Sequence, residues 1–144
     1  MIIPDANLLV YAYDSECRFH PGAKRWLGEL MEGDDRVGLC GPVVFAFVRL
    51  STNPKLFRDP MTVEEAADRV RSWMDVPVTT WEDTKISDLE TALGYLEEIG
   101  VGAGLTTDAQ IAAIARRRAA VIHSADTDFR RFRGVRVVNP LMTK

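Results

Sequence analysis

The sequence has 144 residues, of which 47% are hydrophobic and 27% are charged, and its formal net charge at pH 7 is -3. These values are ordinary for a globular protein, and the length predicts a single domain over residues 1–144. The two cysteines, Cys17 and Cys40, exclude a disulfide framework and a cysteine-ligated zinc site.

Strands and helices alternate along the predicted chain. The expected order is a strand at 1–4, helices at 6–14 and 20–31, a strand at 36–40, helices at 41–52 and 62–73, a strand at 76–80, helices at 83–99 and 107–118, and strands at 120–123 and 135–138. Two helices begin with a capping box, Thr62 with Glu65 and Thr107 with Gln110. The alternation predicts an α/β fold, a three-layer α/β/α sandwich with a mainly parallel central sheet.

The start of the chain and its cysteines indicate where the protein is found. No apolar run approaches the roughly 20 residues that cross a membrane. Asp5 interrupts the apolar start, where a signal peptide would need a long hydrophobic region. Two cysteines that form no framework are expected to stay reduced. We therefore expect a cytoplasmic protein with no membrane partner.

Charge is distributed unevenly along the chain. Residues 59–98 hold eleven acids and three bases, a balance of -8. Residues 116–144 hold seven arginines and one lysine against two acids, a balance of +6, and those two acids are Asp126 and Asp128. This pattern favours a cation site within a surface that attracts phosphate. Alternatively, the triplet at 116–118 only ends a helix, where positive charge suits the helix dipole.

Four aspartates lie where a strand or helix is predicted to begin or end: Asp5, Asp108, Asp126 and Asp128. A parallel sheet gathers the carboxyl ends of its strands at one edge, so these acids can share one hard cation there. Oxygen ligands favour Mg²⁺ or Mn²⁺ over Zn²⁺. Carboxylates crowded together without metal should have raised pKa values. A metal held this way activates water against a phosphodiester, which leaves a 5′-phosphate and a 3′-hydroxyl.

Each aspartate also has a structural alternative. Asp5 suits the N-cap of the following helix, and Asp108 suits the first turn of its own helix. Asp126 and Asp128 suit a turn that caps a short helix running to Phe132. Other polar residues are candidate contacts rather than ligands: Asn7 for substrate, and Ser124 and Thr127 as hydrogen-bond donors to carboxylate or phosphate.

Three segments carry a family resemblance: P-D-A-N-L-L-V-Y-A at 4–12, T-D-A-Q-I-A-A-I-A at 107–115 and S-A-D-T-D-F at 124–129. Together with F-V-R-L-S-T-N-P at 47–54 and V-V-N-P-L at 137–141, they resemble the PIN domain and, within it, the VapC-type toxins. The resemblance implies Mg²⁺- or Mn²⁺-dependent endonuclease cleavage of structured RNA, such as tRNA or rRNA loops. It also implies a homodimer and neutralisation by a cognate VapB-type antitoxin that binds across the active-site groove.

One departure from this family concerns the helix at 41–52. PIN domains usually carry a glutamate there, but this helix contains no acid, and the expected position falls near Phe45 or Phe47. We therefore expect one metal, held by Asp5, Asp108 and Asp126 with Asp128 assisting. Arg49 and Asn53 are candidate RNA contacts, or they only end the helix and start an Asn-Pro turn.

Two other functions remain open on sequence alone. A PIN-like module that has lost catalysis with its glutamate could act only through protein or RNA partners. A phosphotransfer domain is less favoured, because Asp5 stands alone at its strand and residues 116–143 contain no lysine. For an antitoxin helix, the candidate contacts are apolar residues of the first two helices: Leu8, Leu9, Trp26 and Leu30. Alternatively, these residues belong to the core.

Overall fold

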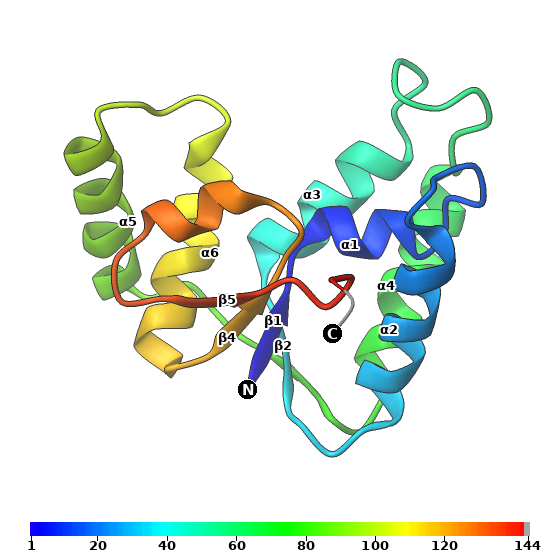
Figure 1. Cartoon of the computed structure of the whole chain (residues 1–144), viewed down its shortest axis with the longest axis horizontal. Coiled ribbons are helices and arrows are strands. Elements are labelled where there is room, and N and C mark those ends of the chain that lie inside the picture. Colours follow the sequence, from blue (N-terminus) through cyan, green and yellow to red (C-terminus); the bar gives the residue numbers. More distant parts are fainter. Residues whose placement is uncertain (143–144) are drawn as a thin grey trace.

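The computed structural model describes residues 1–142, so the predicted domain extends two residues past it. In chain order the elements are β1 (Ile2–Pro4), α1 (Ala6–Tyr11), α2 (His20–Glu32), β2 (Val37–Leu39), α3 (Gly41–Ser51), α4 (Val63–Met74), β3 (Thr79–Trp81), α5 (Ile86–Ile99), α6 (Leu105–Arg118), β4 (Val121–His123), the 3-10 helix η1 (Thr127–Arg131) and β5 (Arg136–Val138). The predicted α/β fold with a parallel sheet is confirmed (Figure 1).

The sheet has the strand order β3-β2-β1-β4-β5, and every neighbouring pair is parallel. Ile2 of β1 pairs with Val37 of β2 on one side and with Val121 of β4 on the other. The chain builds outward from β1 through β2 to β3, then returns past β1 to add β4 and β5. Such crossovers are right-handed, so the reversal places later helices on the opposite face.

Figure 1 shows this division of the helices. α1 to α4 lie on one side of the molecule, and α5, α6 and η1 lie on the other. The reversal occurs between β1 and β4, so these two strands diverge into helices on opposite faces just beyond their carboxyl ends. Ligand sites of open α/β sheets lie at such a switch point. Asp5 and Asp126 follow these two strands in the sequence.

The core is continuous across both layers of helices. Its largest fully buried side chains include Ile3, Leu8, Leu9, Phe47, Ile111, Ile114, Ile122 and Phe129. Phe47 packs edge-on against Trp73, with ring centroids 4.7 Å apart. Leu8, Leu9, Trp26 and Leu30 are all buried in this core, so the alternative of core packing holds and the prediction that they contact an antitoxin helix is wrong. Their helical spacing reflects packing on the sheet.

The acidic and basic segments meet across α5 and α6. Arg117 donates to Asp88 at 2.9 Å, Arg118 pairs with Glu82 at 2.7 Å, and Arg133 pairs with Glu98. Asp88 is almost fully buried, which makes its pair with Arg117 a fixed part of the fold. Much of the positive charge predicted for phosphate therefore neutralises the acids of residues 59–98.

Helix and strand ends differ from prediction in several places. The Thr62–Glu65 capping box is confirmed, with bonds of 3.0 and 3.1 Å. The capping box at Thr107 is wrong, because α6 already begins at Leu105 with no side-chain cap. The first helix ends at Tyr11 rather than residue 14, and the third strand is shifted to Thr79–Trp81, beyond the turn that contains Pro77. No helix within residues 1–142 combines the length and apolarity needed to span a membrane.

Candidate active site

Asp5 stands directly after β1, where the chain turns into α1. Its side chain is only 4% exposed, and its Oδ2 accepts a hydrogen bond from the Ser124 hydroxyl at 2.8 Å. Asp5 occupies the N-cap position, yet its side chain forms no capping hydrogen bond. Burial raises the pKa of Asp5, and the hydrogen bond from Ser124 partly offsets that rise. The Asp5 carboxylate is therefore tied to the segment that follows β4 through Ser124.

The segment after β4 extends this hydrogen-bond chain. The Ser124 hydroxyl accepts from the backbone N–H of Asp126 at 2.9 Å, and Oδ1 of Asp126 accepts from the N–H of Asp128 at 2.9 Å. Asp126 thereby caps η1, so the predicted turn before a short helix is present. Thr127 and Asp128 lie exposed in the first turn of η1. One Asp126 oxygen remains outside this cap.

Asp108 comes from the opposite layer of helices, in the first turn of α6. Its pKa is raised from 3.8 to about 7, first by burial and then by the negative charges of Asp5, Asp126 and Asp128. These charges act on Asp108 because all four aspartates gather at the carboxyl edge of the sheet. The sequence expectation that crowding raises carboxylate pKa values agrees with this environment.

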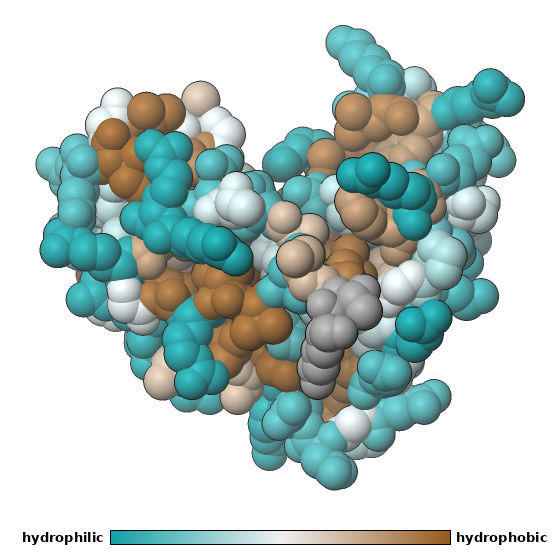
Figure 2. All heavy atoms as spheres, viewed as in Figure 1, coloured by the Kyte–Doolittle hydropathy of each residue, from teal (hydrophilic) through white to brown (hydrophobic). Residues whose placement is uncertain are grey.

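A cleft of about 400 Å³ lies over these acids, between α1, α3 and the start of α6. Its lining includes five of the predicted site residues: Asp5, Asn7, Arg49, Asp108 and Asp126. In the space-filling view, a notch opens at the top of the molecule between the α5–α6 side and the α3–α4 side (Figure 2). The site is therefore an open cleft rather than an enclosed pocket.

The remaining predicted residues do not line this cleft. Ser124 is buried beneath it as the partner of Asp5, and Asp128 and Thr127 lie on η1 beside it. Asn53 instead accepts from the N–H of Lys55 at 2.9 Å through Oδ1, which forms the Asn-Pro turn after α3. The turn interpretation of Asn53 accounts for its contacts.

The side chain of α3 that borders the acids is Ala46, three residues before Arg49 on the same helix face. The positions expected for the missing glutamate both point elsewhere: Phe45 is 68% exposed and Phe47 is fully buried in the core. Sequence reasoning missed Ala46 by one residue. The spacing from Arg49 was the signal that could have identified it.

The loop before α6 supplies a second part of the lining that the sequence did not suggest. Ala103 and Gly104 border the cleft, and Ala103 adopts a left-handed backbone with φ of 46°. This conformation is uncommon for a residue with a Cβ. Strained backbone of this kind often lies at functional sites because surrounding structure must hold it.

His123, the last residue of β4, belongs to the supporting structure and not to the acid cluster. Trp26 donates its indole N–H to Nδ1 of His123 at 3.0 Å. Burial lowers the pKa of His123. These contacts make His123 part of the packing between α2 and β4.

The carboxylates of the cleft are the candidate ligands of a divalent cation. Within residues 1–142 no three histidine, cysteine or acidic side chains already stand together in a coordinating group. The chemistry of the donors nevertheless fits a hard cation, because they are carboxylate oxygens, and burial together with the charges of the other three aspartates raises the pKa of Asp108. Asp5, Asp108 and Asp126, which line the same cleft, are the residues that could hold the ion.

Comparison with known proteins agrees with this fold. A family model described as PIN domain matches residues 2–135. The chain is 38% identical over 141 residues to Ribonuclease VapC33 of Mycobacterium tuberculosis, covering 98% of this chain and 99% of that protein. It is also 38% identical over 140 residues to Ribonuclease VapC37 of the same organism, with 97% of each chain covered.

Solved structures share the fold at lower identity. Mycobacterium tuberculosis VapC20, described as a Sarcin-Ricin loop cleaving toxin, superposes with a TM-score of 0.69 at 20% identity, over 94% of this chain and 99% of its own. The structure of FitAB bound to an IR36 DNA fragment superposes with a TM-score of 0.70 at 20% identity, over 100% of this chain and 98% of its own. Together with the family model and the 38% identical relatives, these findings show that the chain belongs to the PIN-domain family, among its VapC proteins.

Proposed function

We propose that this protein is a divalent-metal-dependent endoribonuclease and the toxin of a toxin–antitoxin pair. The convergence of Asp5, Asp108 and Asp126 on one cleft, with the pKa of Asp108 raised to about 7, carries the proposal. The two relatives named as ribonucleases support the same reaction. The substrate class is structured RNA such as tRNA or rRNA loops, whose unstacked bases are open to recognition.

Asp5, Asp108 and Asp126 would hold one Mg²⁺ or Mn²⁺, with Asp128 assisting from η1. Bound there, the cation would supply positive charge to the phosphodiester and lower the pKa of the attacking water. Ser124 orients the buried Asp5 carboxylate through its hydrogen bond before any cation binds. The expected products are a 5′-phosphate and a 3′-hydroxyl.

One metal suits this site better than two because Ala46 occupies the α3 side of the cleft. A methyl group there provides no oxygen ligand. Arg49 lies one turn further along the same face, and its guanidinium can bind an RNA phosphate through two hydrogen bonds. Asn7, at the opposite wall, can donate to substrate from its side-chain amide.

A VapB-type antitoxin is the proposed protein partner. A cavity of about 630 Å³ lies between α2 and α4, with Leu27, Met31, Trp73 and Val76 among its lining residues. Its lining also includes Lys24, Glu32 and Arg69, and a trough with both apolar and charged side chains suits an amphipathic helix. The solved relatives include VapBC2 from Rickettsia felis, which supports a paired partner of this kind.

A homodimer is the proposed assembly. α5 exposes Ile86, Leu89 and Leu93 at spacings of three and four residues. An exposed apolar stripe of this kind is typical of an interface. Light scattering on the purified protein should give twice the mass of one chain, and Leu89→Glu should give the mass of one chain.

The reaction is tested by incubating the purified protein with total RNA in Mg²⁺, Mn²⁺ or EDTA. Wild-type protein should cut at discrete positions only with metal, and Asp5→Asn and Asp126→Asn should abolish the cuts. Asp75→Asn is the matched control, because Asp75 is exposed at the end of α4, away from the cleft. Sequencing of the cut ends identifies the target.

The test also decides between the enzyme and a catalytically degenerate binding module. Folded protein, free of antitoxin, that leaves varied RNAs intact in every metal would refute the nuclease. The absence of a carboxylate at Ala46 would then be the leading explanation, and RNA or protein binding without cleavage would be the function to measure.

A further inference from the structure

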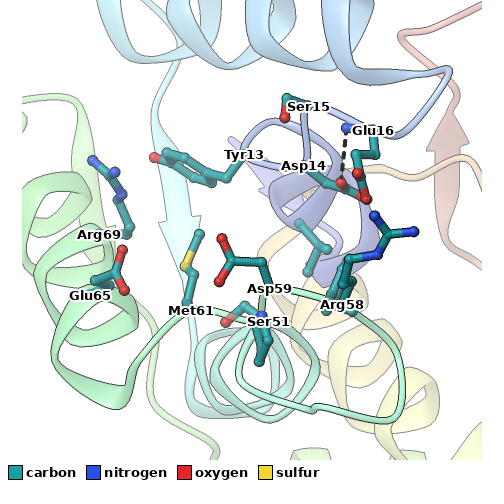
Figure 3. A pocket seen from close by; sticks show the side chains of 13 residues that line it. Tyr13, Asp14, Ser15, Glu16, Ser51, Arg58, Asp59, Met61, Glu65 and Arg69 are labelled. Atoms are coloured by element: carbon teal, nitrogen blue, oxygen red, sulfur yellow. Dashed lines mark hydrogen bonds between the residues drawn. The ribbon is translucent and has the colours of Figure 1, made fainter.

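A second polar cavity lies at the carboxyl ends of α1 and α3, whereas the aspartate cleft lies at the start of α1. It has a volume of about 350 Å³, at the small end of ligand pockets, which run from roughly 300 to 1,000 Å³. Its walls come from the end of α1, the loop 13–16, the end of α3, the loop 57–61 and α4 (Figure 3). None of the acids of the aspartate cleft lines it.

The floor of this cavity contains a hydroxyl with no partner. Ser51 is 4% exposed, and its Oγ is the one buried side-chain nitrogen or oxygen within residues 1–142 that lacks a hydrogen bond. Its backbone carbonyl accepts from the N–H of Met61 at 2.9 Å, which fixes the loop onto the end of α3. An unsatisfied buried polar group costs roughly 1–3 kcal/mol. A ligand N–H reaching Ser51 would remove that cost.

The rim of the cavity is acidic. Asp14, Glu16, Asp59 and Glu65 face Arg58 and Arg69, a balance of -2. Two of these carboxylates already accept hydrogen bonds from the backbone. Asp14 accepts from the N–H of Glu16, and Glu65 accepts from the N–H of Thr62. Asp59 has no ion pair within residues 1–142, and Figure 3 shows its carboxylate in the middle of the cavity, between Tyr13 and Ser51.

The aromatic wall identifies the shape of cation that fits. The guanidinium of Arg69 lies 5.0 Å from the centroid of the Tyr13 ring, so this aromatic ring already packs with a guanidinium. Trp73 donates to the Tyr13 hydroxyl at 2.8 Å and fixes the ring. A planar guanidinium can bind a carboxylate such as Asp59 through two hydrogen bonds while one N–H reaches a hydroxyl. Phosphate is disfavoured by the negative balance.

We propose that this cavity binds the guanidinium of an arginine side chain presented by a partner polypeptide, with Asp59 as its carboxylate and Ser51 as its buried acceptor. A polypeptide is favoured because Tyr13, Ser15 and Arg69 also line the cavity between α2 and α4, which makes one trough longer than a small ligand. The choice of a polypeptide rests on the proposed antitoxin function, whereas the guanidinium site itself does not.

The test is an amide NMR titration of the full-length protein, which requires no nuclease activity. The probes are agmatine, n-butylammonium and a capped Ala-Ala-Arg-Ala-Ala peptide. Agmatine and the peptide should shift amides of Tyr13–Glu16 and Ser51–Met61, and butylammonium should bind at least tenfold more weakly. Asp59→Asn should weaken peptide binding at least tenfold and Ser51→Ala severalfold, while Asp75→Asn should leave it unchanged. Asp59 is exposed, so its substitution spares the core.

Three outcomes would overturn the proposal. Shifts confined to the aspartate cleft would place the cation there instead. Equal binding by wild type and Asp59→Asn would remove Asp59 from the site. Binding of agmatine without binding of the peptide would assign the cavity to a free small molecule and exclude a polypeptide partner. Failure of RNA cleavage bears on none of these results, so the two proposals fail separately.

Discussion

Replacing Asp108 by asparagine should stabilise the metal-free protein at alkaline pH. Asparagine resembles the protonated acid in shape but cannot ionise. In the folded protein the pKa of Asp108 is about 7, against 3.8 for an ordinary aspartate. The folded state therefore holds this proton more tightly than the unfolded state, and stability falls as pH rises from about 4 to about 7. Asp108→Asn should not show this fall in stability, because asparagine does not ionise.

The magnitude follows from the difference of about 3 pKa units. At 1.36 kcal/mol per unit, the difference corresponds to about 4 kcal/mol if Asp108 were fully shielded from water. Asp108 is only partly buried, so solvent screening reduces the expected effect to about 2 kcal/mol. The variant should be more stable than wild type by about this amount at pH 8 and equal to it near pH 4.

Urea denaturation in EDTA, followed by circular dichroism at pH 4, 6 and 8, measures the difference directly. Asp75→Asn serves as the exposed control and should follow wild type at every pH. Adding Mn²⁺ at pH 8 should stabilise wild type more than Asp108→Asn, because the variant has lost one ligand. Parallel pH profiles for wild type and Asp108→Asn, or a variant less stable at pH 8, would refute the crowding of charge on Asp108.

Three further substitutions probe separate parts of the structure. Phe47→Ala should lower the free energy of unfolding by about 3–5 kcal/mol, because it removes a fully buried ring that packs against Trp73 and leaves a cavity. Urea denaturation measures this free energy, and a loss below about 1 kcal/mol would contradict the packing. Trp26→Phe removes the donor to Nδ1 of His123, so an NMR titration should find a higher His123 pKa, and an unchanged pKa would disprove the hydrogen bond's role. Ala46→Glu should raise the number of Mn²⁺ ions bound per chain in calorimetry, and an unchanged number would mean that this side chain does not reach the metal.

The acids at the strand ends could be predicted from sequence because two simple rules fix them. Short apolar strands end at Asp5 and at Ser124, and a parallel sheet brings such ends together. Asp108 could be assigned to the site only because the other three aspartates were expected there. An acid in the first turn of a helix is common for electrostatic reasons alone. The structure explains its position through α6, which crosses from the opposite face.

Other features depended on information that local sequence does not carry. The position expected for the missing glutamate in α3, Phe45 or Phe47, is one residue away from Ala46. Phe47 lies in the core, whereas Ala46 lines the cleft. The role of the arginines of α6 was left open between phosphate binding and helix ending, because the partners of Arg117 and Arg118, Asp88 and Glu82, are distant in the sequence. Burial and pairing between residues far apart in the sequence decide the roles of these side chains. The spacing of apolar residues along a helix shows neither.

The hydrogen bond between Asp5 and Ser124 joins residues that are 119 positions apart. During translation, β1 leaves the ribosome early but must wait for β4 before its second edge is paired. A nascent chain that already contains Asp5 and Asp108 therefore still lacks the strand that brings Asp126 to them. The proposed metal site can therefore form only when synthesis of the polypeptide is almost complete.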